Sequence, residues 1–313
     1  MVYYGYVIML QKFKSSRYVF ILLFVGALIT AAAVASRHPS FAVLQPAGTI
    51  AYEQRKLIYF GLLLSLIVVV PVFGLTAYIV WKYRATKTSS TYRPDWDHSR
   101  TLESIWWGLP CLIILILGIV TWQSSHHLDP YRPISSSQPT LRVQAVALQW
   151  KWLFLYPDLG IASVNYLKIP VDRPVHFEIT ADAPMNSFWI PRLGGQVYAM
   201  PGMTTQLNLQ ATSPGMYRGS SANLSGTNFA DMHFMTEAVS GQDFSDWSES
   251  VRIPTDTGTS RLSEADYAVL AEPNVASSTK IYNAYDNQLF DSILAKYMAM
   301  GSHDQMKSTE GAQ

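Results

Sequence analysis

The chain has 313 residues, of which 49% are hydrophobic and only 14% are charged, and its formal net charge is +1. Soluble domains average about 25% charged residues. The deficit here falls in the first 130 residues, which excludes a wholly soluble protein and indicates a membrane protein with a polar second half. The near-neutral charge gives no reason to expect a nucleic-acid partner. The single cysteine, Cys111, cannot build a disulfide framework or a thiolate metal site.

The first apolar segment runs from Tyr18 to Ala35. The basic residues that precede it are Lys12, Lys14 and Arg17. A basic stretch, an apolar core and small residues at its end are typical of a secretory signal, with cleavage expected after Ala35. A segment of this length could also just span a bilayer. Residues 1–35 are therefore expected to be a signal sequence or an N-terminal anchor.

Residues 48–130 are predicted to form a transmembrane hairpin. Its first helix covers about residues 57–80, which carry no charge and reach about 36 Å, enough to cross a bilayer. Its second helix covers about residues 105–123, with tryptophans near both ends, as membrane interfaces favour. The connecting loop, 81–104, is rich in Lys and Arg and is therefore expected in the cytoplasm. Everything after Gln123 is then periplasmic in a bacterial cell.

Residues 140–240 are predicted to form an all-β domain, because short strand-like stretches alternate with turns rich in Gly, Pro, Ser and Asn. The expected strands are Leu141–Tyr156, Ile161–Ile169, Val175–Thr180, Ser187–Ile190, Thr204–Gln210 and His233–Val239. Helical patterns replace them over residues 241–313, where Ser263 and Asp266 are expected to start a helix. The predicted fold class is a membrane-anchored α+β chain with a two-helix hairpin, a β-sandwich or barrel and a helical, aromatic-rich tail.

Four sequence stretches carry a resemblance to a known family. They are HSRTLESIWWGLP (His98–Pro110), LQWKWLFLYPDLG (Leu148–Gly160), MNSFWIPRLGGQVYAMPGM (Met185–Met203) and RGSSANLSGTNFADMHF (Arg218–Phe234). With the order of hairpin and β domain, they resemble subunit II of the haem-copper respiratory oxidases from about Gly48 to the end of the chain. The resemblance implies that the periplasmic domain is cupredoxin-like.

Copper-bearing members of this family hold a dinuclear copper centre with a histidine and a C-x-x-x-C-x-x-x-H-x-x-M loop. Two bridging thiolates suit soft copper ions, and the histidines and a weak methionine complete the sites. The matching positions here, including the one whose backbone carbonyl would contribute, are Asn186, Ser221, Asn223, Ser225, Phe229 and Met232. Serine is a hard, neutral donor and phenylalanine is no ligand, and only the methionine is retained. No metal or other cofactor is therefore expected in this chain.

This loss of ligands resembles the cytochrome bo-type ubiquinol oxidases, which take electrons from a membrane quinol and need no copper relay in the periplasm. Residues Leu262–Asn274 and Tyr282–Met298 are similar to the aromatic-rich tail of that branch. The resemblance implies a proton-translocating complex of the bacterial inner membrane that uses ubiquinol. Its subunit I would hold the haems and copper, and subunits III and IV and membrane lipid would be further partners. Relatives carry a lipoprotein cysteine, but Arg37–Gly48 has none, so lipid anchoring is not expected.

Glu103 opens the second membrane helix at its expected cytoplasmic edge. A carboxylate in a first helical turn is favoured by the helix dipole and needs no further role. The resemblance implies a second interpretation, in which the glutamate at this motif position lies at the mouth of a proton pathway, the K channel, into subunit I. A carboxylate at a membrane boundary can collect protons from water.

The remaining candidates are expected to have structural roles. Trp150 and Trp152 lie in the aromatic strand, and with no copper to relay electrons from they are expected to pack onto subunit I and the membrane surface. His126 and His127 point in different directions on a helix and have no evident third ligand. Met200 and Met203 are expected to pack the domain rather than bind copper. No chemistry is assigned to His98, His176 and His233.

Two other functions stay open at this stage. One is a copper-carrying, electron-accepting subunit of a cytochrome c oxidase, which the missing ligands argue against. The other is a membrane-tethered β domain with a binding or assembly role and no oxidase partner. Bound copper would distinguish the cytochrome c oxidase subunit from a quinol oxidase subunit. Co-purifying haem would distinguish a quinol oxidase subunit from the tethered β domain.

Overall fold

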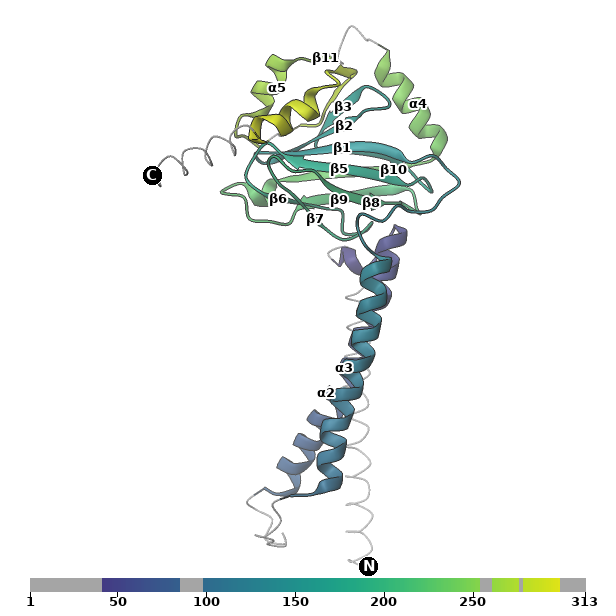
Figure 1. The fold of residues 1–313 in the computed structure, drawn as a ribbon, viewed down its shortest axis with the longest axis vertical. Coiled ribbons are helices and arrows are strands. Elements are labelled where there is room, and N and C mark those ends of the chain that lie inside the picture. Colours follow the sequence, from purple (N-terminus) through teal and green to yellow (C-terminus); the bar gives the residue numbers. More distant parts are fainter. Residues whose placement is uncertain (1–40, 85–97, 254–260, 276–277, 299–313) are drawn as a thin grey trace, which may run out of the picture. The chain divides into compact units, whose positions relative to one another are not determined.

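The computed structural model describes residues 41–84, 98–253, 261–275 and 278–298 (Figure 1). The chain divides into two compact units, Met1–Pro46 and Ala47–Gln313. Of the first unit the structure describes only residues 41–46, which include the short 3-10 helix η1 (Ala42–Leu44). The expected signal or anchor at residues 1–35 lies outside the described residues, and so does most of the expected cytoplasmic loop.

Helices α2 (Thr49–Lys82) and α3 (Arg100–His127) are long and apolar enough to cross a membrane. Both extend beyond the apolar stretches from which they were predicted, because polar turns continue each helix at its ends. Most of their apolar side chains are exposed. A hydroxyl within the span bonds inside its own helix, since the Ser65 Oγ donates to the Gly61 carbonyl at 2.9 Å. Lipid offers polar groups no partner, so this surface suits lipid or another membrane subunit.

Two sheets form the β domain. The six-stranded sheet has the order β12-β3-β2-β1-β5-β8 and the five-stranded sheet the order β4-β10-β9-β6-β7. The first contains β1 (Leu141–Leu148), β2 (Lys151–Tyr156), β3 (Ile161–Val164), β5 (Val175–Ala181), β8 (Thr205–Leu209) and β12 (Lys280–Tyr282). The second contains β4 (Tyr166–Pro170), β6 (Asn186–Trp189), β7 (Val197–Ala199), β9 (Gly215–Ser221) and β10 (His233–Val239).

Two of the predicted strand stretches are each divided by a residue with positive φ. Trp150 (φ 65) separates β1 from β2, which are antiparallel neighbours with Leu148 opposite Lys151. Asn165 (φ 55) separates β3 from β4, so that these strands belong to different sheets. Its side-chain oxygen accepts a hydrogen bond from the Trp152 amide at 2.8 Å. Left-handed residues of this kind redirect the chain, and apolar periodicity does not reveal them.

Strand β2 and the second half of β1, residues 145–148, are buried on both faces, which explains why their sequence alternates only in part. The aromatic core between the two sheets contains Trp152, Phe154, Phe177, Phe188 and Phe234. The rings of Phe188 and Phe234 stack with centroids 5.3 Å apart. The opposite face packs against the C-terminal tail in a second cluster that includes Val146, Leu148, Leu153, Leu155, Leu289, Phe290 and Ile293.

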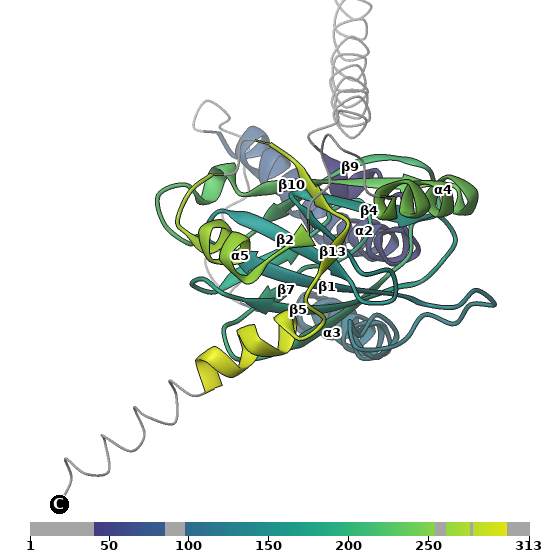
Figure 2. The ribbon, with the colours of Figure 1, turned by 90° about the horizontal axis from the view of Figure 1, so that it is seen from above.

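The C-terminal tail covers the outer face of the six-stranded sheet (Figures 1 and 2). After α4 (Gly241–Arg252), it contains β11 (Arg261–Leu262), α5 (Glu264–Ala271), β12, β13 (Ala284–Tyr285) and the helical residues 289–298. Strand β12 extends the sheet by pairing with β3. Ser263 and Asp266 form a capping box at the start of α5, which confirms the predicted helix start. The predicted fold class is confirmed as well: two apolar helices, a β-sandwich and a helical tail.

Candidate functional site

The loop that matches the family's copper loop joins two neighbouring strands. Strand β9 ends at Ser221, the 3-10 helix η2 (Phe229–Asp231) follows, and β10 begins at His233. Because β9 and β10 are antiparallel, the two ends of the loop lie side by side. The Ser221 amide donates to the Met232 carbonyl at 3.1 Å. The topology therefore gathers the matched positions at one end of the five-stranded sheet.

Ser221 and Asn186 are joined by a direct hydrogen bond. The Ser221 hydroxyl donates to Oδ1 of Asn186 at 2.6 Å, and both side chains are buried. Asn186 opens β6, which pairs with β9, so sheet pairing brings these two positions together. The Asn186 amide nitrogen donates in turn to the Pro184 carbonyl at 2.8 Å. Where copper-bearing relatives would place an imidazole and a thiolate, this chain has a neutral, hydrogen-bonded pair.

The middle of the loop is held by two other segments. Nδ2 of Asn223 donates to the Met185 carbonyl at 3.0 Å. The indole N–H of Trp150 donates to the Ser225 carbonyl at 3.3 Å. The Trp150 ring also lies against Gly226, where a Cβ atom would be 3.5 Å from the ring. Trp150 therefore covers the loop. Trp152 lies wholly in the core of the sandwich, so the expectation that it packs onto subunit I and the membrane surface is wrong.

The last two matched positions are apolar. Phe229 is half-buried at the start of η2. Met232 is 1% exposed and belongs to the sandwich core. The retained methionine therefore contributes to packing in this fold.

These side chains do not fit a dinuclear copper centre, which draws on thiolates and imidazoles. The polar oxygens of Asn186 and Ser221 bind each other, and Met232 packs among apolar side chains. Within the part of the chain that the structure describes, no group of three or more His, Cys, Asp or Glu side chains could hold a metal ion. No electron-transfer step can be derived through this loop.

Glu103 lies in the first turn of α3 and its side chain is exposed. Its Oε1 accepts a hydrogen bond from the Ser99 amide at 3.3 Å, and its own amide donates to the Ser99 carbonyl at 2.9 Å. The side chain thus satisfies a backbone donor at a helix start, where the dipole favours negative charge. The side chain stays exposed with this contact in place.

The histidines are dispersed over the described residues. His126 Nδ1 lies 2.7 Å from the Trp122 carbonyl, and the two rings are 4.5 Å apart. His176 Nδ1 lies 2.9 Å from Oδ1 of Asn208. His233 is exposed at the start of β10. That His126 and His127 are interfacial polar residues stays a prediction.

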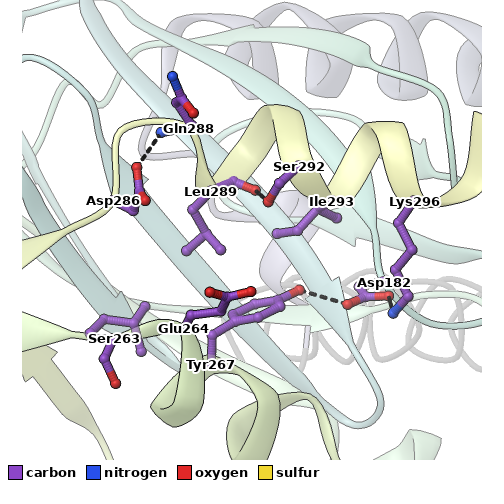
Figure 3. Close-up of a pocket in the computed structure, with 11 residues that line it drawn as sticks. Asp182, Ser263, Glu264, Tyr267, Asp286, Gln288, Leu289, Ser292, Ile293 and Lys296 are labelled. Carbon is purple, nitrogen blue, oxygen red and sulfur yellow. Dashed lines mark hydrogen bonds and ion pairs between the residues drawn. The ribbon is translucent and has the colours of Figure 1, made fainter.

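The sequence motifs gave no sign of Asp182, which directly follows β5. Its side chain lies beside those of Tyr267 and Lys296 (Figure 3). Its carboxylate accepts hydrogen bonds from the Tyr267 hydroxyl at 2.7 Å, Lys296 Nζ at 2.6 Å and the Tyr297 hydroxyl at 2.6 Å. The Asp182 side chain is 1% exposed, whereas that of Lys296 is 48% exposed. Burial raises the pKa of the Asp182 carboxyl, but the three donors outweigh it and hold the pKa below its ordinary value of 3.8. A pocket of about 360 Å³ lies beside the carboxylate.

Lys151, at the start of β2, is a second buried charge that the sequence did not reveal, with 1% of its surface exposed. Its ammonium group donates to the Glu272 carbonyl at 2.9 Å and to Oδ1 of Asn274 at 2.6 Å. Burial lowers the pKa of Lys151. Glu272 is the C-terminal capping residue of α5, so the ammonium binds the negative end of that helix.

Three regions of the chain match families of known proteins. Residues 36–123 match the transmembrane domain of cytochrome c oxidase subunit II, residues 161–239 match its periplasmic domain, and residues 257–301 match the COX aromatic-rich motif. A crystal structure of the periplasmic domain of subunit II of cytochrome oxidase from Bradyrhizobium japonicum aligns with 38% of this chain and 96% of that chain, at 24% identity and a TM-score of 0.35.

Similar full-length proteins are quinol oxidase subunits. Ubiquinol oxidase subunit 2 of Acetobacter aceti is 46% identical over 257 residues, covering 82% of this chain and 82% of that protein. Cytochrome bo(3) ubiquinol oxidase subunit 2 of Pseudomonas aeruginosa is 45% identical over 255 residues, covering 82% and 76%. Quinol oxidase subunit 2 of Bacillus subtilis is 40% identical over 227 residues, covering 72% and 71%.

The apolar hairpin, the β-sandwich and the aromatic-rich tail together define a subunit II of the haem-copper oxidases, anchored in a membrane and carrying a periplasmic domain. Within that class, the chain belongs to the ubiquinol oxidase subunit 2 family. The resemblance drawn from the sequence motifs is thereby confirmed.

Proposed function

We propose that this chain is subunit II of a proton-translocating ubiquinol oxidase, a complex that oxidises ubiquinol and reduces oxygen to water. The similarity to ubiquinol oxidase subunits over most of the chain supports this function. The observation that carries it is the hydrogen-bonded Ser221–Asn186 pair, which stands where copper ligands would be. A quinol delivers electrons from within the membrane, so the periplasmic domain needs no metal relay.

The redox cofactors would belong to a partner subunit. In this proposal the chain binds no haem or copper and has no catalytic residue of its own, and subunit I holds both kinds of metal group. The exposed apolar side chains of α2 and α3 support a role in packing against such a membrane subunit. The complex would lie in the bacterial inner membrane, with subunits III and IV and lipid as further contacts.

Glu103 would supply protons to the complex from the cytoplasmic side. It lies at the start of α3, whereas the β domain follows the other end of the same helix. A span of 28 residues is about 42 Å long, enough to place Glu103 and the β domain on opposite sides of a bilayer. An exposed carboxylate at that edge can take up protons and deliver them to a buried pathway.

The proposal is tested on the complex purified in detergent through an affinity tag on this chain. We expect haem to co-purify, oxygen to be consumed with reduced ubiquinone analogues, and reduced cytochrome c to be a poor donor. Copper should be present only in the amount that the oxygen-reducing site of subunit I binds. A dinuclear copper signal, or fast turnover with cytochrome c, would favour the electron-accepting subunit of a cytochrome c oxidase. Purification without haem would favour a free-standing tethered β domain.

A further inference from the structure

Two buried charges of opposite sign lie at the same end of the six-stranded sheet. Lys151 opens β2, and Asp182 follows the last residue of β5. Strand β1 lies between them, with Leu148 opposite Lys151 and Ala147 beside Ala181. Lysine and aspartate are almost never this deeply buried without specific partners. Their partners therefore indicate what these two charges do.

Within the described residues, every group that forms a hydrogen bond with the Asp182 carboxylate or the Lys151 ammonium belongs to the tail. Asp182 binds Tyr267 in α5 and the neighbouring residues Lys296 and Tyr297 in the final helix. Lys151 binds the Glu272 carbonyl and the Asn274 side chain, at and just beyond the end of α5. The sandwich thus offers one anion and one cation, and the tail offers donors to the first and acceptors to the second.

Helix α5 connects the two charges across the strand ends. From Tyr267 to Glu272 the helix advances about 7.5 Å, and the two strand spacings from β5 to β2 amount to about 9.6 Å. The side chains of Lys151 and Tyr267 cover the difference between these two lengths. The helix can therefore be held at both anchors at once, across the width of the strand β1 that separates them.

The same two segments contact the loop 221–232. Trp150, next to Lys151, donates to the Ser225 carbonyl at 3.3 Å. On the other side, the segment that follows Asp182 contains Met185 and Asn186, which accept hydrogen bonds from Asn223 and Ser221. The Asp182 amide also donates to the Ala147 carbonyl at 2.9 Å, which fixes the start of that segment to β1.

We propose that the aromatic-rich tail braces this loop: by binding Lys151 and Asp182, it fixes the two segments that hold residues 221–232. A metal bound at the matched positions would tie Asn186 to the loop directly, and here the tail and the Ser221–Asn186 bond provide that connection. The brace is a property of the sandwich and the tail, whichever electron donor the complex oxidises.

The test is hydrogen–deuterium exchange of backbone amides in the purified complex, followed in residues 221–232, 185–190 and 261–275. The variant Tyr267→Phe combined with Tyr297→Phe removes two donors to Asp182 and keeps both rings. Lys151→Met and Asp182→Asn remove each charge at similar size. The control is Tyr156→Phe, which removes a buried hydroxyl that bonds the Lys168 backbone rather than the tail.

We expect exchange to rise about tenfold in the tail and also in residues 221–232 of the double tyrosine variant, given the strength of hydrogen bonds to charged groups. Lys151→Met should act in the same way from the other anchor, and the control should leave the loop unchanged. Faster exchange in the tail with unchanged protection of the loop would overturn the brace. Unchanged exchange in both would also overturn it, because the bonds would not be holding the tail. If Asp182→Asn fails to assemble, the double tyrosine variant decides alone, since it keeps the buried charge and its lysine partner.

Discussion

Tyr267 and Asp182 lie 85 positions apart in the sequence, and the tyrosine hydroxyl donates to Oδ2 of the aspartate at 2.7 Å. This bond joins the tail to the end of β5. The carboxylate is removed from water and depends on three donors from the tail to offset the cost of its burial. The tail is therefore attached by polar contacts as well as by the apolar cluster beneath it.

Substitutions around Asp182 should differ in cost according to burial. Tyr267→Phe leaves the carboxylate short of one donor and should cost about 1.5–3 kcal/mol of unfolding free energy. Lys296→Met should cost less than Tyr267→Phe, because the lysine side chain is 48% exposed and solvent screens its charge. Denaturant unfolding of the full-length chain in detergent, followed by tryptophan fluorescence, measures both. An equal or reversed order would show that the ion pair, and not the buried hydroxyl, holds the tail.

Acid should weaken the attachment of the tail. The pKa of Asp182 is lower in the folded protein than its ordinary value of 3.8, because its three donors outweigh the effect of burial. A carboxyl with a lowered folded pKa stabilises the fold above its unfolded pKa, about 3.9, and this stabilisation is lost as the pH falls through the folded value. The contribution is therefore complete at pH 7 and fades below about pH 4.

The groups that face Asp182 in its pocket are Tyr267, Lys296, Glu264 and Asp286, so the titration of Asp182 must be isolated by substitution. Thermal unfolding measured from pH 7 down to pH 3 should show a smaller loss of stability in Asp182→Asn than in the unmodified chain. Glu237 is a second carboxyl with a lowered pKa. Burial raises the pKa of Glu237, but the hydrogen bonds from the Tyr166 and Lys168 side chains lower it by more. If the unfolding temperature depended on pH in the same way in Asp182→Asn and in the unmodified chain, Asp182 would be excluded as a source of the acid sensitivity.

Local patterns were enough to predict the hairpin, the β domain and the helix start at Ser263, because charge, periodicity and capping residues act over a few positions. They did not reveal the turns at Trp150 and Asn165, since tryptophan is rare in the left-handed region and a single asparagine also occurs in many other conformations. The partly apolar pattern of residues 141–156 was the one indication that β2 and the second half of β1 are covered on both faces.

Only part of the candidate site could be predicted from the sequence. The matched positions came from the family motif, and the sheet pairing that joins Asn186 to Ser221 explains why two distant stretches form one site. Asp182 and Lys151 could not have been found in this way. Their partners lie 85 to 123 positions away, and a single charged residue after a strand resembles any solvated turn.

The two serines of the loop should respond differently to loss of their hydroxyl. Ser221→Ala leaves the buried Oδ1 of Asn186 without its donor and should cost about 1–3 kcal/mol. Ser225→Ala should be close to neutral, because within the described residues its buried hydroxyl has no hydrogen-bond partner. Denaturation midpoints of the two variants provide the comparison, and equal losses would mean that the Ser221–Asn186 bond does not stabilise the loop. Quinol oxidation and copper content should stay the same in both variants.

Glu103→Gln should slow oxygen reduction severalfold while the complex still assembles. The amide oxygen of glutamine can still accept the bond from the Ser99 amide, so the start of α3 should persist, but the side chain can no longer carry a proton. Glu103→Asp keeps a titratable carboxyl and should recover part of the rate. The matched control is Glu53→Gln, since Glu53 is an exposed carboxylate in α2 that pairs with Lys56 at 2.8 Å. Turnover is measured as oxygen consumption per haem with saturating quinol. Unchanged turnover in Glu103→Gln, or an equal loss in Glu53→Gln, would remove the proton-uptake role and leave Glu103 as a helix-capping residue.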